Sequence, residues 1–106
     1  MPKVSLVEEF AGITDHWTPE VVAELNGQQV KLAKFMGEFQ WHKHSNEDEL
    51  FLVVRGAIRV ELRNESVELG EGEFFVVPRG AEHRPVADAE AEVLLFEPSS
   101  TIRTGG

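Results

Sequence analysis

The sequence contains no cysteine. This absence excludes disulfide bonds, thiolate nucleophiles, iron–sulfur clusters and cysteine-based zinc sites. A metal site in this chain must therefore use histidine, carboxylate groups and water as ligands. Long hydrophobic runs are missing too, since no stretch has the length of a membrane span and residues 1–4 are not followed by an apolar leader. We therefore expect a cytoplasmic protein without a membrane partner.

Basic residues are scarce. The chain has 10 Lys and Arg residues against 19 Asp and Glu residues, which gives a formal net charge of −9. Because a phosphate backbone repels so acidic a domain, nucleic acid is excluded as a partner. The length of 106 residues, of which 42% are hydrophobic, fits one globular domain over residues 1–106.

Signals for a helix are confined to the first dozen residues. Ser5 and Glu8 have the spacing of a capping box, which predicts a short helix within an N-terminal extension over residues 1–18. So short a helix is not stable alone, and we expect it to pack against the rest of the domain.

From about Val21 onward the sequence has the pattern of short strands. The strongest turn signal is Asn26-Gly27, because both residues of a tight hairpin turn need positive φ. Turn signals recur about every ten residues and separate roughly seven or eight strands, which is typical of an all-β antiparallel sandwich or closed barrel. The last apolar run is residues 93–96, and residues 98–106 form a small, polar tail that we expect to fray.

Two of the predicted strands, residues 50–54 and 93–96, are apolar at every position. Alternate residues of a strand point to opposite faces, so both faces of these strands need cover. In so short a chain the second cover is often another subunit, and we therefore expect a homodimer.

Three histidines and one glutamate form the pattern that carries chemistry. His42 and His44 are two residues apart, so on a strand their imidazoles point to the same face. Glu49 follows a polar stretch, and His83 follows a Pro-x-Gly turn. Imidazole with carboxylate suits a divalent transition metal such as iron, manganese, nickel or zinc. The alternative interpretation is that these are ordinary surface and loop side chains, as an isolated His-x-His pair usually is.

Residues 37–56 and 72–87 resemble the first and second motifs of the cupin superfamily. The first stretch contains a glycine, the His-x-His pair, the glutamate and a closing glycine, and the second contains a glycine, Pro-x-Gly and His83. One position departs from the pattern, since Ala87 stands where the second motif commonly has asparagine. The chain is most similar to the small single-domain bacterial cupins often called mannose-6-phosphate isomerase-like.

The resemblance implies a fold and a metal site. The implied fold is the cupin jelly-roll barrel, or double-stranded β-helix. The implied cofactor is one divalent transition metal held inside the barrel by the residues at the family's four ligand positions, which are His42, His44, Glu49 and His83. The set is complete, and the position of Ala87 is not a ligand position.

Substrate choice depends on the side chains around this site. Strand alternation predicts a narrow and largely apolar pocket for a small molecule. We expect it to be lined by Gln40, Phe51, Phe74 and Lys34, with Phe75 replacing Phe74 if the register of that strand differs. No cluster of Lys and Arg suited to a phosphate is visible, which disfavours a phosphosugar isomerase.

Two hypotheses for the function remain open. The first is a metal-dependent enzyme on a small organic substrate, either a dioxygenase or an isomerase or lyase in which Glu49 acts as the base. The second is a non-catalytic protein that binds a small metabolite, with a structural or ligand-capturing metal. The second hypothesis is motivated by the lack of a further acid, base or nucleophile near the motifs.

Overall fold

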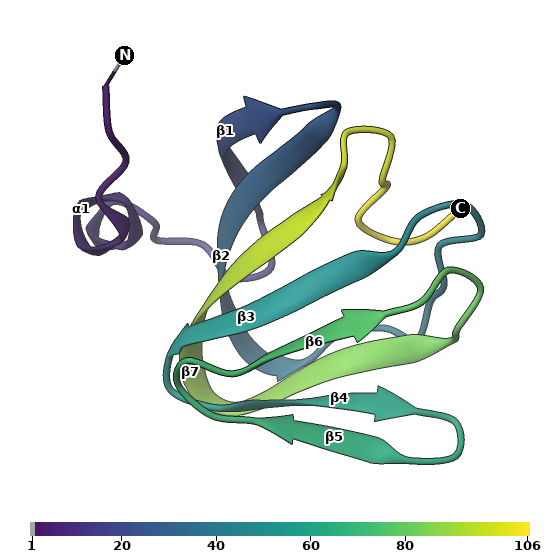
Figure 1. Cartoon of the computed structure of the whole chain (residues 1–106). Coiled ribbons are helices and arrows are strands. Elements are labelled where there is room, and N and C mark those ends of the chain that lie inside the picture. The colour runs from purple at the N-terminus through teal and green to yellow at the C-terminus, as the bar shows by residue number, and fades with distance from the viewer. Residues whose placement is uncertain (1) are drawn as a thin grey trace.

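A computed structural model describes residues 2–106, which form one short helix and seven strands (Figure 1). All strand pairs are antiparallel, and the expected all-β jelly-roll fold with an N-terminal helix is confirmed. The strands are β1 (Glu20–Leu25), β2 (Gln28–Glu38), β3 (Glu49–Arg55), β4 (Ile58–Leu62), β5 (Ser66–Leu69), β6 (Phe74–Val77) and β7 (His83–Pro98).

The helix α1 (Leu6–Ala11) begins as the sequence predicts. Ser5 is its N-cap, and the Ser5 hydroxyl accepts a hydrogen bond from the backbone N–H of Glu8 at 3.3 Å. Phe10, only 1% exposed, packs with Ile13 and Leu32 against the outer side of the sheet. The helix is therefore held by the body of the domain, as its length requires. Within residues 2–106 no helix has the length and hydropathy needed to cross a membrane.

The hairpin of β1 and β2 also forms at the predicted turn. Asn26 and Gly27 have φ angles of 51° and 78°, the positive values that a tight hairpin turn demands. The turn fixes the register, in which Leu25 faces Gln28.

Strand β7 organises the sheet, since it pairs with β2, β3 and β4 (Figure 1). The sequence prediction of a last strand over residues 93–96 was too short, because β7 begins at His83 and ends at Pro98. The reason lies at residues 88–90, which are exposed and break the apolar pattern in the middle of the strand. The first half of β7 pairs with β4 and the second half with β3.

The core lies between the two halves of this sheet. Its side chains come from every second residue of the strands, so that Phe51 and Val53 of β3 face Val93 and Leu95 of β7 in the interior. The other buried core residues are Ala33, Phe35, Ile58, Val60, Leu69, Val77, Ala87 and Ala91.

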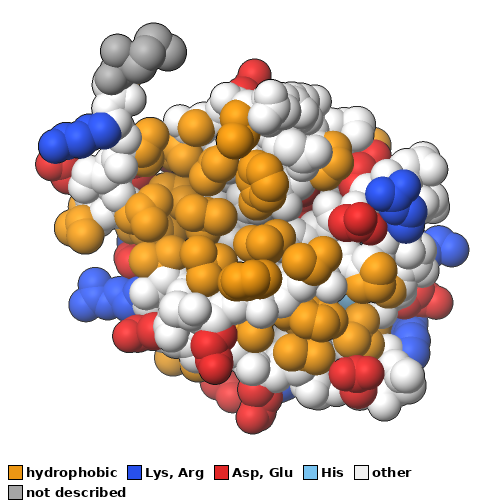
Figure 2. Space-filling view, viewed as in Figure 1, with side chains coloured by type: hydrophobic (Ala, Val, Ile, Leu, Met, Phe, Trp, Pro, Cys, Tyr) orange, Lys and Arg blue, Asp and Glu red, His pale blue; other side chains and the backbone are white. Residues whose placement is uncertain are grey.

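The opposite side of the sheet is apolar as well, and we call it the outer apolar face. Cross-strand pairing over β2, β7, β3 and β6 arranges it as two rows: Val30, Phe96, Leu50 and Val76, then Leu32, Leu94, Leu52 and Phe74. Helix α1 packs on the end that contains Leu32 and Leu94. Phe74 and Val76, at the other end, are 61% and 44% exposed. Figure 2 shows hydrophobic side chains gathered over this side of the molecule.

Residues 99–106, where the sequence predicts a fraying tail, form a strap that runs along the barrel and is hydrogen-bonded to it (Figure 1). The backbone N–H of Ser45 donates to the Gly106 carbonyl at 3.0 Å, and the Gly106 N–H donates to the Lys43 carbonyl at 3.2 Å. Gly105 allows this contact, because its φ is 99° and a Cβ there would lie 2.6 Å from the Lys43 carbonyl oxygen. Small residues in this stretch therefore serve close packing rather than mobility.

Candidate metal centre and adjoining pocket

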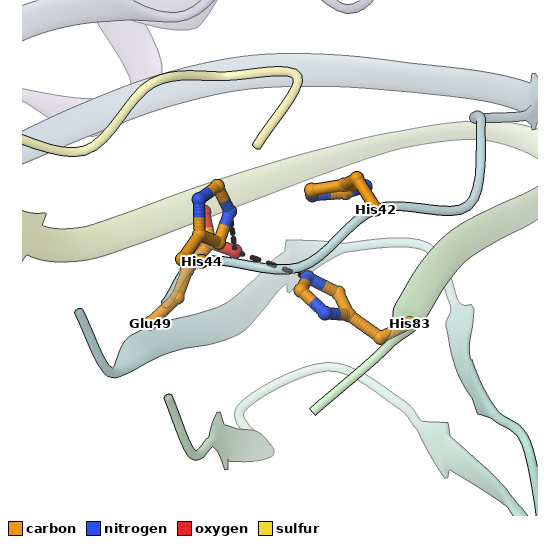
Figure 3. A group of neighbouring side chains, drawn as sticks. All are labelled: His42, His44, Glu49 and His83. Atoms are coloured by element: carbon orange, nitrogen blue, oxygen red, sulfur yellow. Dashed lines mark hydrogen bonds and ion pairs between the residues drawn. The ribbon is translucent and has the colours of Figure 1, made fainter. Parts of the chain in front are cut away.

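Four potential ligands converge inside the barrel (Figure 3). His42 and His44 lie in the segment between β2 and β3, Glu49 is the first residue of β3, and His83 is the first residue of β7. One donor atom from each residue lies within 4.8 Å of the donor atoms of the other three. His44, Glu49 and His83 are buried and His42 is half-buried. The fold thus brings together residues as distant in the sequence as His42 and His83, which are 41 positions apart.

The prediction that the His-x-His pair lies on a regular strand was wrong. Residues 39–48 follow the end of β2, and their only β-type pairing within the described residues 2–106 is an isolated bridge between His42 and His83. A bulge between Phe35 and Gly37 shifts the register of β2 just before this segment. The extended backbone still turns both imidazoles toward the barrel interior, so the alternation argument holds without the strand.

Backbone carbonyls fix the tautomers of two histidines. The His42 Nδ1–H donates to the Gln40 carbonyl at 3.0 Å, and the His83 Nδ1–H donates to the Ala81 carbonyl at 2.9 Å. A carbonyl only accepts, so in the neutral imidazole the lone pair is on Nε2. Burial lowers the pKa of His42 below 6.5, which keeps its ring neutral at pH 7. His42 therefore presents an unprotonated nitrogen to the centre, whereas His83 Nε2 is also in hydrogen-bond contact with Glu49 Oε1 at 3.3 Å.

The buried ring nitrogens of His44 fit a metal-ligand role. Both of its ring nitrogens are buried, and neither has a hydrogen-bond partner among the residues described. Its Nε2 lies 3.3 Å from Glu49 Oε1, but the angles do not make a hydrogen bond. An unpartnered buried polar group costs about 1–3 kcal/mol, a penalty that a bound metal ion removes.

Glu49 holds its charge at the centre of the cluster. Its Oε1 lies 3.3 Å from His44 Nε2 and also 3.3 Å from His83 Nε2. Burial alone raises the pKa of this carboxyl, but the two imidazoles outweigh burial and lower the pKa below its ordinary value. Three imidazoles and one carboxylate could hold a divalent transition metal.

A narrow pocket with a volume of about 40 Å³ adjoins the candidate metal centre. That space equals a few water molecules and suits a small ligand. Besides His42 and Glu49, its walls consist mostly of apolar and aromatic side chains with three charged groups: Trp17, Pro19, Phe35, Phe39, Phe51, Pro85 and Leu95, with Lys31, Glu97 and Arg103.

Of the four residues expected in the pocket, Phe51 lies in its wall. The expectation for Phe74 was wrong, because the register of β6 leaves Phe74 61% exposed and turns Phe75 toward the core. Lys34 also points away from the interior, since its neighbour Phe35 occupies the inward position of β2. Lys31 is the basic residue of β2 that reaches the pocket.

The fourth expected pocket residue, Gln40, has an exposed side chain, and the contact it makes with the site is through its backbone. Its carbonyl accepts the hydrogen bond from His42 described above. It follows β2 in an irregular segment, where strand parity no longer predicts the direction of a side chain.

The sequence reasoning missed Glu97, which is 3% exposed and lies in the same pocket. One oxygen accepts a hydrogen bond from Lys31 Nζ at 2.9 Å, and the other, Oε2, has no partner among residues 2–106. Burial, a side-chain hydrogen bond with Glu49 and the charge of Glu49 raise the pKa of Glu97 to about 8. Parity could have revealed this residue, because Glu97 follows the buried Val93 and Leu95 at steps of two along one strand.

The mouth of the pocket is built by aromatic rings and by the strap. Trp17 stacks on Phe35 and Phe39, with ring centroids 4.4 Å and 5.0 Å apart. Arg103, from the strap, donates from Nη1 to the Trp17 carbonyl at 2.8 Å. His16, which the sequence analysis did not place in the site, instead pairs with Glu90 at 2.7 Å on the surface.

Comparison with known proteins agrees with this architecture. Residues 30–97 match the family model Cupin_2, described as a cupin domain. The crystal structure of a cupin-2 domain containing protein from Shewanella frigidimarina is similar at a TM-score of 0.88 and 39% identity, covering 90% of this chain and 93% of that one. Protein NMB1881 from Neisseria meningitidis is similar at a TM-score of 0.85 and 31% identity, covering 92% of this chain and 100% of that one.

A match is also found with protein YdbB of Bacillus subtilis strain 168, an uncharacterized protein. It is 36% identical over 64 residues, which are 59% of this chain and 57% of YdbB. The matched stretch therefore spans little more than half of that relative. The family match covers both motifs and the whole ligand set, and the fold agrees over nine-tenths of the chain. The chain therefore belongs to the Cupin_2 family and is a small cupin with a buried three-histidine, one-glutamate group that could hold a metal ion.

Proposed function

We propose that this cupin is a divalent-metal-dependent enzyme that transfers a proton on a small organic substrate, as an isomerase or lyase does. The observation that supports this proposal is the buried carboxyl group of Glu97 in the same pocket as His42 and Glu49. A purely structural metal site needs the four ligands and no such neighbour. The hypothesis of a non-catalytic binding protein is motivated by the lack of a further acid or base near the motifs. Glu97 supplies such a group beside the ligands.

The residues divide into two roles in this proposal. A bound divalent ion supplies Lewis-acid polarisation of a substrate oxygen. Glu49 is a ligand and a weak proton acceptor, because its pKa is lowered by His44 and His83. Glu97 is the better acid–base group, because its pKa is raised to about 8 by burial and by the hydrogen bond and charge of Glu49, so its carboxyl group can hold a proton near neutral pH and accept one once ionised. Lys31 holds the other oxygen of Glu97 and orients the carboxyl group.

The pocket supports a small substrate and exclusion of water. Trp17, Phe35 and Phe39 form a stacked aromatic wall, and the free volume is about 40 Å³. A low-polarity wall strengthens the electrostatic effect of a charged group on the reacting atoms. The dioxygenase alternative uses the same ligands but assigns no proton transfer to Glu97, so the two reactions can be told apart.

Hydrogen–deuterium exchange tests the proposal. Protein purified without a histidine tag is first analysed for bound metal, and a panel of small 2-oxo acids and ketones is then incubated with it in deuterated buffer. We expect NMR to show metal-dependent exchange at the carbon next to the carbonyl. The Glu97→Gln variant is expected to lose at least about 100-fold in rate, within the range of general-base catalysis.

The matched control is Glu82→Gln, since Glu82 is exposed and pairs with Arg63 on the surface. This variant is expected to keep the exchange rate. Bound metal without exchange on any compound would favour the binding protein, and oxygen consumption with Fe(II) that is unaffected in Glu97→Gln would favour the dioxygenase. Absence of metal from the purified and reloaded protein would contradict both enzymatic hypotheses.

We also infer that the outer apolar face binds a second copy of the chain. Two neighbouring rows of uncharged side chains cover four strands, and α1 packs on one end of them only. Two copies that each carry a net charge of −9 repel one another wherever acidic groups meet. An uncharged sheet face such as that around Leu50, Leu52 and Phe74 is therefore the surface through which they associate most favourably.

A further inference from the structure

The strap places a cationic side chain at the mouth of the pocket. Arg103 lies two residues after Thr101, which is buried, and three before Gly106, whose N–H donates to the Lys43 carbonyl at 3.2 Å. Both sides of Arg103 are therefore anchored, and its backbone is held beside the metal-ligand segment. The Arg103 side chain then reaches the pocket from outside.

Arg103 has spare hydrogen-bonding capacity. Within residues 2–106, its one hydrogen bond goes from Nη1 to the Trp17 carbonyl, and no carboxylate lies within 4.0 Å of the guanidinium. A guanidinium has five N–H donors in a planar fork that matches a carboxylate. The backbone carbonyl fixes the direction of the fork and leaves most donors for a ligand.

The other titratable groups of the pocket already contact protein groups. Lys31 pairs with Glu97 at 2.9 Å, and Glu49 faces the imidazoles of the metal centre. The double positive charge of a bound divalent ion would exceed the single negative charge of Glu49, and Arg103 would add another positive charge. The loaded pocket is therefore cationic although the whole chain is strongly acidic, and it favours a small anion.

We propose that Arg103 binds a carboxylate group of the substrate, which makes this cupin specific for small oxo or hydroxy carboxylic acids. The proposal rests on the proposed function, because it assigns the substrate class of the same pocket. The narrow space of about 40 Å³ and the aromatic wall favour a planar carboxylate over a bulkier, doubly charged phosphate. The carboxylate end contacts Arg103 at the mouth, and the oxo or hydroxy end lies toward the ligand cluster.

Calorimetric titration of the Co(II)-loaded protein tests this assignment with pyruvate and pyruvamide. The two molecules have nearly the same shape and the same oxo group, but only pyruvate is charged. We expect pyruvate to bind at least about 10-fold more tightly than pyruvamide, as a charge-assisted hydrogen bond contributes. In Arg103→Ala the affinity for pyruvate should fall by about 10-fold to 100-fold while that for pyruvamide stays within about 3-fold. Inorganic phosphate serves as a third probe.

Arg55→Ala is the matched control, because Arg55 is exposed at the far end of β3 from Glu49. Equal affinities for pyruvate and pyruvamide, unchanged pyruvate binding in Arg103→Ala, or tighter binding of phosphate than of pyruvate would each overturn the assignment. Co(II) affinity is measured separately for every variant and should not change in Arg103→Ala. Failure of Co(II) to bind contradicts the proposed function, and an Arg103-dependent preference for pyruvate in the metal-free protein would then still support the carboxylate site.

Discussion

His42 and His83 are bound to each other through their backbones. The His42 N–H donates to the His83 carbonyl at 3.0 Å, and the His83 N–H donates to the His42 carbonyl at 2.9 Å. Each ring also donates from Nδ1 to the carbonyl two residues earlier in its own segment. The two imidazoles are therefore set in position and tautomer by the protein itself, and the centre is preorganised for an ion.

Removal of His44 should abolish metal binding while the fold persists. We expect His44→Ala to weaken metal affinity by more than about 100-fold, since loss of a mere supporting hydrogen bond to a ligand already costs about 10-fold to 100-fold. Wild-type protein at a free metal concentration of 100 times Kd should gain about 2.7 kcal/mol of stability, and His44→Ala should gain almost none. Thermal unfolding with and without metal measures both. His16→Ala, which alters an exposed pair with Glu90, should behave as wild type. An equal rise in Tm for His44→Ala would contradict the metal centre.

The carboxyl group of Glu97 should make the stability of the metal-free protein fall as pH rises. Its folded pKa of about 8 lies above the ordinary value of 4.5, because burial and the neighbouring Glu49 raise it. The contact with Lys31 lowers the pKa and offsets only part of this rise. Between those values the folded state holds a proton that the unfolded state has released, so rising pH favours unfolding. Glu49, whose pKa is lowered, contributes no further change above about pH 5.

Chemical denaturation between pH 5 and pH 8 tests whether stability falls as pH rises. The stability of wild type relative to Glu97→Gln should decrease across the range by at most a few kcal/mol. Comparison of the two proteins cancels the titration of the histidines, which both share. A constant difference, or one that grows with pH, would show that Glu97 is ionised in the folded state near neutral pH.

A single methyl group at Gly105 should detach the strap. The Cβ of Gly105→Ala would lie 2.6 Å from the Lys43 carbonyl oxygen, and the φ of 99° is strained for any side chain. We expect the Ser45 and Gly106 amides to lose hydrogen-exchange protection and the carboxylate affinity to fall with Arg103 displaced. Gly27→Ala is the matched control, because Gly27 has a φ of 78° with open space around it. Unchanged protection in Gly105→Ala would mean that the strap is not held by this contact.

A charge on the outer apolar face should give a monomer. Phe74 is 61% exposed, so Phe74→Glu should not disturb the core, and light scattering should show the mass of one chain where wild type shows two. Val7→Glu provides the control, since Val7 is 83% exposed on α1 and does not belong to the two rows. A monomeric wild-type protein at micromolar concentration would contradict the dimer.

The sequence predicts the fold and the ligand set well because both depend on local or repeated signals. The Asn26-Gly27 turn, the Ser5 cap and the alternating strands are such signals, and His42, His44, Glu49 and His83 stand at motif spacing. The pocket is predicted less well, because its residues are chosen by register. A shift of one residue in the inward-facing positions of β6 replaces Phe74 by Phe75. The same shift in β2 turns Lys34 away from the interior.

The strap and Glu97 show a second limit of sequence reasoning. Residues 99–106 are small and polar, which is typical of a frayed end, and their backbone contacts with Lys43 and Ser45 become visible only in the structure. Glu97 shares the parity of the buried Val93 and Leu95, but its charge at the end of an apolar run is typical of a solvent-exposed boundary residue. Its burial depends on Lys31, which β2 supplies from 66 positions earlier in the sequence. Partners so distant become visible only in three dimensions.

Strand β7 also governs when the metal centre can form during folding. It carries His83 at its first position and Glu97 near its last, and it pairs with three strands that all precede it in the chain. Pairing over such sequence distances requires closure of long loops and is slow, on the order of milliseconds to seconds in all-β domains. A chain emerging from the ribosome therefore has no complete ligand set until β7 has been synthesised and has docked. A metal ion held by these four residues would consequently be loaded late, and because it would bind only the finished barrel, it would slow unfolding without speeding folding.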